Sequence, residues 1–274
     1  MQRNRNSRGI SVFNLDLELG KLYAIWLREF KVFLREKSRL VASTFTPLLW
    51  LFVLGGGLGS AVSTTTPVPS NTSNIDYQEF IFPGIVIMSV IFSSVFFGAY
   101  IIWDRKFDFL KSVMVAPVRR STIFLGKTFG GMTTSLIQAF ILLAIGALIG
   151  INYTAESVIS FVVIVLMLSF ALTSLGLAIG SYMESLEGFQ LIVSFVAFPI
   201  YFLSGALFPL DNIPLWLSIL TSINPATYAV EALRNSMLGI PGKNLFIVNI
   251  GVLFMTSIAL GIAGVLSFKR MKAV

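Results

Sequence analysis

The sequence lacks cysteine and histidine altogether, and charged residues make up only 12% of its 274 positions. Without cysteine the chain has neither disulfides nor thiolate ligands. Without histidine, most transition-metal sites and hydrolytic triads lose their usual ligand or general base. We therefore expect no catalytic residue, no metal ligand and no bound cofactor on this chain.

The shortage of charge indicates that lipid is the main solvent of this protein. A soluble domain carries about 25% charged residues, whereas this chain is 55% hydrophobic, with a mean hydropathy of +0.85. The net charge of +7 does not favour nucleic-acid binding, because the basic residues fall in blocks at the ends of apolar stretches. There they face anionic lipid and set the orientation of the chain.

Six stretches are long enough to cross a bilayer, because a spanning helix needs about 20 predominantly apolar residues. They are free of Asp, Glu, Lys and Arg, and run between Arg39 and Asp76, Glu79 and Asp104, Lys127 and Glu156, Glu156 and Glu184, Glu187 and Asp211, and Lys243 and Lys269. The Ser/Thr/Pro-rich segment 63–70 predicts that the first helix ends near Ala61. We see no internal repeat and no signal peptide in the charged first 38 residues.

We therefore predict an all-α membrane protein with one membrane domain. Its parts are a flexible N-terminus (1–16), an amphipathic interface helix (17–39), a six-helix transmembrane domain (40–268) and a basic tail (269–274). A seventh uncharged stretch, between Asp211 and Glu231, is broken by Pro214, Asn224 and Pro225. It predicts an external re-entrant or interfacial hairpin, with an additional span as the alternative.

The distribution of Lys and Arg predicts that both termini are cytoplasmic. With six spans, the N-terminal segment, the connection after the second span and the tail fall on one side of the membrane. Together they hold 18 of the 20 basic residues. Positive residues concentrate on the cytoplasmic side, so we expect a multi-pass protein of the cell (inner) membrane.

The segment 17–40 predicts an amphipathic helix at the cytoplasmic membrane surface. Large apolar side chains recur at helical spacing (Leu19, Leu22, Tyr23, Trp26, Phe30, Phe33 and Leu34), while basic side chains occupy another face (Lys21, Arg28, Lys31 and Arg35). This pattern is typical of a helix with its apolar face in the acyl boundary and its basic face toward headgroups. A soluble helix packed on a partner has the same pattern and remains the alternative.

The connection from Asp104 to Lys127 predicts a docking surface. It carries apolar residues among its charges (Phe107, Phe109, Leu110, Val113 and Met114), so it can form a short helix with an exposed apolar knob that invites a partner. Pro117 would end that helix before Arg119. A basic loop that only anchors the topology is the alternative.

Two further patterns concern packing and nucleotides. Glycine pairs spaced by four predict close helix contacts within the chain (Gly55/Gly59, Gly126/Gly130, Gly146/Gly150 and Gly176/Gly180). The run Gly126-Lys127-Thr128 ends like a phosphate-binding loop, but Ser121 stands where that motif needs its first glycine. We therefore exclude a nucleotide site here. We also expect no buried charge cluster of the kind that an ion-coupled transporter uses.

An ordered signature follows the fifth predicted span. It comprises Ser204-Gly205, Phe208-Pro209, Pro214-Leu215-Trp216-Leu217, and Asn224-Pro225 followed by Tyr228, Glu231 and Arg234. This set resembles the C-terminal signature of the ATP-binding-cassette (ABC) type-2 export permeases. The surface helix, Pro47 in the first span and Ala116-Pro117 in the basic connection are similar to that family too.

The resemblance implies a function and a set of partners. It implies a transport subunit without enzymatic activity, working as two permeases, in a homodimer or heterodimer, with two copies of an ABC ATPase that carries the ATP and Mg. The coupling surface would comprise the interface helix (Trp26, Arg28, Phe30, Arg35) and the connection (Asp104, Arg105, Phe107, Phe109, Leu110, Met114, Pro117). The external signature would comprise Gly205, Pro209, Pro214, Trp216, Asn224, Pro225, Tyr228, Glu231 and Arg234, in which Glu231 and Arg234 could pair or lie exposed.

The cargo suggested by this resemblance is amphipathic, lipid-linked or drug-like. Two other classes remain as alternatives: a secondary transporter, and a lipid-modifying enzyme or assembly factor. The first is disfavoured because no inverted repeat is visible. The second is disfavoured because the available acids are scattered over both sides of the membrane.

Overall fold

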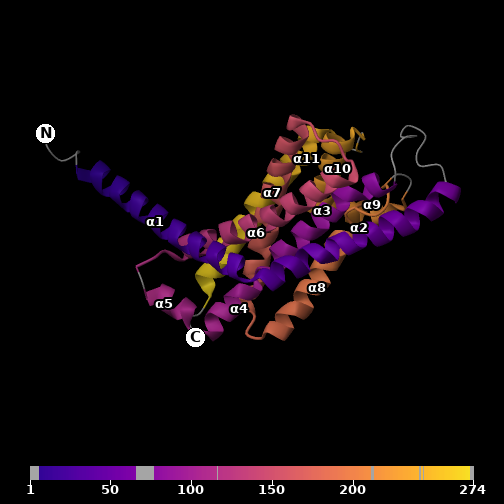
Figure 1. Ribbon diagram of the computed structural model, residues 1–274. Coiled ribbons are helices and arrows are strands. Elements are labelled where there is room, and N and C mark those ends of the chain that lie inside the picture. The colour runs from indigo at the N-terminus through magenta and orange to yellow at the C-terminus, as the bar shows by residue number, and fades with distance from the viewer. Residues whose placement is uncertain are drawn as a thin grey trace.

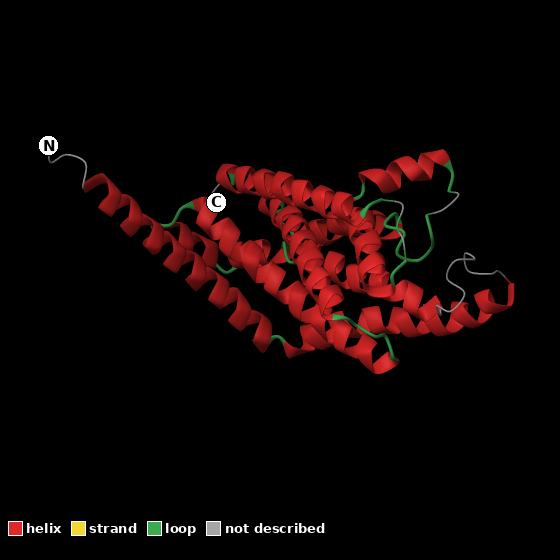
Figure 2. Cartoon of the chain, turned by 90° about the horizontal axis from the view of Figure 1, so that it is seen from above, coloured by secondary structure: helices red, strands yellow, loops and turns green. Residues whose placement is uncertain are grey.

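The computed structural model describes residues 6–65, 77–115, 117–210, 213–240, 242 and 244–271. In these ranges the regular secondary structure is all α-helical, as predicted, with loops and turns between the helices (Figure 2). The helices are α1 (Asn6–Arg35), α2 (Lys37–Thr65), α3 (Tyr77–Phe96), α4 (Ala99–Lys106), α5 (Phe109–Val115), α6 (Arg120–Ile149), α7 (Ala155–Tyr182), α8 (Leu186–Phe202), α9 (Leu215–Ile223), α10 (Pro225–Leu238) and α11 (Phe246–Arg270).

Five helical segments of the described residues are long and apolar enough to cross a membrane. They are Leu40–Gly57, Tyr77–Lys106, Arg120–Ile149, Ala155–Tyr182 and Phe246–Arg270. The fifth predicted span corresponds to α8, an apolar helix of 17 residues. At about 1.5 Å per residue, α8 is a few ångströms shorter than a hydrocarbon core of about 30 Å. The sixth crossing therefore stays a prediction.

Helices α3 and α7 form the centre of the bundle. All residues from Ile81 to Ile91 are buried, as expected for a helix that is apolar on every side. Helix α7 packs against α3, α6 and α11. At the junction of α3 and α4, the backbone at Gly98 touches the backbone of α7. A Cβ added to Gly98 would lie only 2.1 Å from the Gly176 carbonyl oxygen. Small residues are required at such a crossing, so the predicted contact at Gly176/Gly180 is confirmed.

Several predicted boundaries are wrong. Residues 6–16, predicted to be flexible, continue α1, whose N-terminal part extends from the bundle as an arm (Figure 1). Helix α2 runs on to Thr65, past the predicted end near Ala61 and through Pro47 without a break; residues 66–70 of the predicted loop lie outside the described residues. Lys269 and Arg270, assigned to the tail, belong to α11.

The predicted break before the last span is confirmed as two short helices. Asn224 ends α9 and caps α10, because its side-chain oxygen accepts from the Ala226 N–H (3.0 Å). Its side-chain amide also donates to the Ile200 carbonyl of α8 (2.7 Å). Pro225 occupies the first turn of α10, where a missing N–H costs nothing. Helix α10 is packed on α3, α7 and α11, whereas α9 exposes Leu215, Trp216 and Ile223.

Candidate functional site

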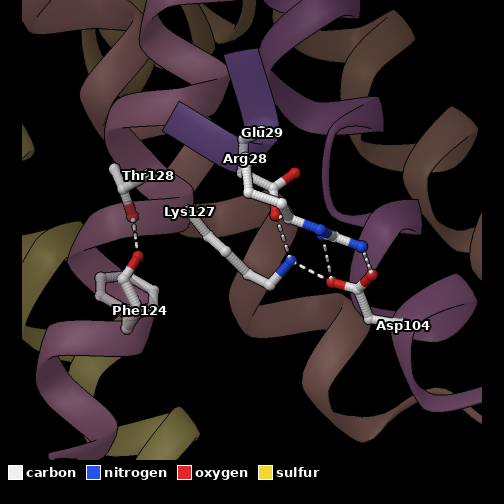
Figure 3. A network of polar contacts seen from close by, with 6 residues as sticks. All are labelled: Arg28, Glu29, Asp104, Phe124, Lys127 and Thr128. Atoms are coloured by element: carbon white, nitrogen blue, oxygen red, sulfur yellow. Dashed lines mark hydrogen bonds and ion pairs between the residues drawn. The ribbon is translucent and has the colours of Figure 1, made fainter. Parts of the chain in front are cut away.

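Four charged side chains from three helices meet at one end of the bundle. Arg28 and Glu29 come from α1, Asp104 from α4 and Lys127 from α6 (Figure 3). Arg28 donates two bonds to Asp104, Nη2 to Oδ1 at 2.7 Å and Nη1 to Oδ2 at 3.1 Å. Lys127 Nζ donates to Glu29 Oε1 at 2.9 Å and also to Asp104. We call these four residues the ion cluster.

The ion cluster is buried and electrically neutral. The side chains of Glu29 and Lys127 are each 1% exposed, that of Asp104 5% and that of Arg28 33%. Burial disfavours the charge on Arg28, but its hydrogen bonds to Asp104 and the charge of Glu29 outweigh this cost and raise the pKa of Arg28. Removing one partner from such a network leaves a buried charge uncompensated, at a cost of about 3–5 kcal/mol. The cluster thus fixes α1 to the rest of the molecule.

Two glycines let α1 approach α6 closely enough for these contacts. A Cβ added to Gly126 would lie 2.8 Å from Ile25, and one added to Gly130 would lie 2.6 Å from the Glu29 side chain. The predicted close helix contact at Gly126/Gly130 is thus confirmed, and the helix that packs against these glycines is α1. Trp26 completes this interface by donating from Nε1 to the Thr133 hydroxyl at 2.9 Å.

Arg28 also connects the ion cluster to the short helix α5. Its guanidinium carbon lies 3.8 Å from the centroid of the Phe109 ring, a cation–π contact worth about 0.5–2 kcal/mol depending on desolvation. Helix α5 ends at Val115, before Pro117, as predicted. Arg28 is therefore one route by which a displacement of α5 would act on α1 and α4.

The connections at this end of the molecule are tied together by further polar contacts. Lys21 Nζ donates to the Pro117 carbonyl, and Glu18 accepts from Lys21 (3.0 Å) and from the Thr122 hydroxyl. These two bonds, that from Thr122 foremost, lower the pKa of Glu18. Arg120 donates to the carbonyls of Lys269 and Met271, at 2.8 Å each. The connection after α4, the helix α1 and the end of α11 therefore lie together (Figure 1).

An apolar surface is exposed next to the ion cluster. Phe107 is 69% and Val115 89% exposed, and Phe107 stacks on the half-exposed Trp103 with ring centroids 5.6 Å apart. Exposed apolar patches of this kind mark interaction sites. We call the stacked pair Trp103 and Phe107 the apolar knob.

The structure corrects several predictions for the connection. Asp104 and Arg105 are not in a loop but in the last turn of α4, and Lys127 lies well inside α6. Leu110 is buried with Phe124 and Phe268 instead of contributing to the knob. The sequence did not predict the buried ion cluster, which is tolerated inside a helical bundle because its charges neutralise one another.

The other predicted coupling residues have distinct places. Arg105 donates to the carbonyls of Met183 (2.9 Å) and Ser181 (3.0 Å), and so connects α4 to the end of α7. Pro117 is exposed. Met114 belongs to α5, and its side chain lies outside the described part of the chain.

The predicted interface segment is helical as far as Arg35, where α1 ends, but Arg28 does not lie on the basic face predicted for it. Arg28 turns toward Asp104 rather than toward headgroups, whereas Lys31 and Arg35 are exposed. Phe30 stacks on Trp26, with centroids 5.7 Å apart. Sequence reasoning missed Glu29. The signal was its spacing of four from Ile25 and Phe33, which puts an acid on a buried stripe of the helix.

The signature residues lie at the other end of the bundle and differ in their exposure. Gly205, Asn224, Glu231 and Arg234 are buried, whereas Pro209, Pro214 and Trp216 are exposed and Pro225 and Tyr228 are half-buried. Arg234 donates to the carbonyls of Phe80 (3.2 Å) and Ala206 (2.8 Å) and lies over the Phe80 ring. Glu231 accepts from Asn244 (3.2 Å), so the anticipated Glu231–Arg234 pair is replaced by separate bonds. Tyr228 donates to the Ser222 carbonyl (2.7 Å), holding α9 against α10.

The fold and this site define a polytopic helical membrane protein with a charged, partly apolar surface at one end. The family model of the ABC-2 type transporter matches residues 20–238. The chain is 30% identical to the inner membrane transport permease YadH of Escherichia coli (strain K12), over 87% of this chain and 90% of that protein. It is also similar to the transport permease ycf38 of Cyanophora paradoxa (28% identical, 92% and 89%) and to nodulation protein J of Rhizobium leguminosarum bv. viciae (24%, 84% and 86%). The chain belongs to the ABC-2 type transporter family.

Proposed function

We propose that this chain is the membrane-spanning permease subunit of an ATP-driven exporter, without enzymatic activity of its own. Two copies, as a homodimer, would work with two copies of a separate ABC ATPase, which binds ATP and Mg. The cargo would be an amphipathic, lipid-linked or drug-like compound moved out of the cytoplasm or the inner leaflet. The observation that carries this proposal is the apolar knob at the end of α4, because it adjoins an ion cluster that links three helices.

The proposed location is the inner membrane, with six crossings and both termini in the cytoplasm. The positive-inside rule supports this orientation, since α1, the α4–α6 connection and the end of α11 are basic and lie together. The relative YadH is named as an inner membrane transport permease. Helix α8 would supply the sixth crossing, and α9 with α10 the external hairpin.

Force would pass from the ATPase through the apolar knob to the ion cluster. An ATPase that moves α5 would move Phe109 against Arg28, and through Arg28 the buried Asp104 at the end of α4. Export would then be a rigid-body change between the two permeases. The ion cluster does not favour an ion-coupled secondary transporter. Such transporters hold their ion sites near the bilayer midplane, whereas Asp104 lies in the last turn of its span.

The proposal is tested by purification and reconstitution. Affinity-tagged permease extracted in mild detergent with ATP and Mg should retain an ATPase in a two-to-two complex by native mass spectrometry. In proteoliposomes, Phe107→Ala should weaken ATPase binding about thirtyfold, since truncating a central aromatic at an interface costs about 2 kcal/mol or more. Leu148→Ala is the matched control, because Leu148 is equally apolar and 87% exposed at the far end of α6.

Two results would overturn the proposal. One is a permease that is stable and transports its cargo without any ATPase. The other is a Phe107→Ala variant that binds and stimulates the ATPase as the wild type does, which would remove the apolar knob from the coupling surface.

A further inference from the structure

A cavity of about 400 Å³ lies between α2, α3, α6 and α8. This volume falls in the range of about 300–1,000 Å³ that is typical of small-molecule sites. Trp50, Phe92, Phe96 and Phe198 supply aromatic walls, and the rings of Phe92 and Phe198 meet edge to face at 5.1 Å. These walls lie within one copy of the chain.

One side of the cavity is polar, and this polarity is not satisfied within the described protein. Gln138, 1% exposed, donates its amide N–H to Ser43 Oγ at 2.7 Å, which leaves its carbonyl Oε1 buried with no partner among the described residues. Ser89, 3% exposed, likewise has a buried hydroxyl with no partner there. Ser43, Ser89 and Gln138 all line the cavity.

Among the buried hydroxyls of the surrounding helices, Thr44 Oγ1 on α2 also lacks a partner within the described residues, but Thr44 does not line the cavity, and other hydroxyls are paired. The hydroxyls of Ser93 and Ser94 both hydrogen-bond to the Ser135 hydroxyl at 2.8 Å, and the Thr134 hydroxyl donates to the Gly130 carbonyl. Such pairings are the rule in an apolar bundle, because a buried polar group without a partner costs about 1–3 kcal/mol. Gln138, held by the Ser43 bond, thus brings to the wall of the cavity an acceptor, Oε1, that has no partner among the described residues.

We infer that this cavity is a binding site for an amphipathic molecule with an apolar body and a hydroxyl or amide N–H. The apolar body would lie among Trp50, Phe92, Phe96 and Phe198, and the O–H or N–H would donate to Gln138 Oε1. Gln138 is then the residue that selects for a hydrogen-bond donor. This inference deepens the proposed function, and the interpretation of the cavity as a cargo site rests on that function.

Binding can be tested on the permease alone, because the cavity needs no ATPase. A single-tryptophan variant that keeps Trp50 (Trp26→Phe, Trp103→Phe, Trp216→Phe) is placed in nanodiscs and titrated with 12-bromododecan-1-ol or its methyl ether. Bromine quenches tryptophan fluorescence at contact, and the two probes differ in the single O–H donor. We expect saturable quenching in which the alcohol binds about tenfold more tightly than the ether, the value of one well-formed buried hydrogen bond.

The preference should depend on Gln138. Gln138→Leu keeps the shape of the side chain and removes the acceptor, so the alcohol and the ether should bind equally. Gln190→Leu is the matched control, because Gln190 is exposed on α8, and it should retain the tenfold preference. Ser43→Ala should reduce the preference without abolishing it, since the orienting bond is lost but Oε1 remains.

Three results would overturn the inference. They are non-saturable quenching, equal affinity of the alcohol and the ether for the wild type, and a preference that survives in Gln138→Leu. Because no ATPase is present, a failure here leaves the exporter proposal standing. A failure to find an ATPase complex, in turn, leaves the binding result intact and removes only its interpretation as a cargo site.

Discussion

The replacement Lys127→Met tests the energetic importance of the ion cluster. Methionine keeps the length of the lysine stem and removes its charge. The cluster would then hold two carboxylates, Glu29 and Asp104, against the single guanidinium of Arg28. Leaving a buried charge uncompensated costs about 3–5 kcal/mol, and each kcal/mol lowers the Tm of a chain of this size by about 2–4 °C. We therefore expect a fall in Tm of about 10 °C in detergent, measured by thermal unfolding.

A second substitution separates charge imbalance from lost packing. Asp104→Asn in the Lys127→Met background restores neutrality, so the double variant should be more stable than Lys127→Met alone by about 1–3 kcal/mol. Lys106→Met is the control, because Lys106 is exposed in the same region, and its Tm should stay within about 1–2 °C of the wild type. A Lys127→Met protein as stable as Lys106→Met would refute the reasoning.

Three further substitutions probe other contacts. Arg28→Lys keeps the charge but loses the bidentate hydrogen bond to Asp104 and the planar contact with Phe109. Stimulation of ATP hydrolysis in proteoliposomes should therefore fall several-fold while assembly persists. Unchanged stimulation would argue against force passing from Phe109 through Arg28 to Asp104. Gly98→Ala should lower stability by about 1–3 kcal/mol in thermal unfolding, because the new methyl overlaps the Gly176 carbonyl. Gly251→Ala is the control and should be neutral or slightly stabilising, because Gly251 faces open space. Equal Tm values for the two variants would contradict the close contact between Gly98 and Gly176. Asn224→Ala should cost about 1–2 kcal/mol through loss of the α10 cap, read as increased amide exchange in α9 and α10, and unaltered exchange would refute this role.

Patterns of local origin were predictable from the sequence. The helix that ends before Pro117 and the break at Asn224-Pro225 follow from rules that concern one or two neighbouring residues. The family signature was also recognisable, because its residues recur in a fixed order. These features needed no knowledge of which helices meet.

The ion cluster was not predictable in the same way. Charge was used as a sign of the membrane boundary, which misplaced Asp104 and Lys127 outside the helices that contain them. Only the three-dimensional packing shows that Asp104 is neutralised by partners 76 and 23 residues away, and Lys127 by partners 98 and 23 residues away. A pairing at such separations leaves no periodicity in the sequence, whereas the spacing of Ile25, Glu29 and Phe33 was a detectable trace of it.

The arm formed by α1 offers a spectroscopic handle on the working cycle. Because the chain has no native cysteine, Leu19→Cys on α1 and Val115→Cys on α5, both at exposed positions, can carry spin labels without any background to remove. The distance between the labels would follow the arm relative to the helix beside it, with and without nucleotide. Reporter fusions are better joined ahead of α1 than behind α11, where Arg120 is bound to the last turn and to Met271.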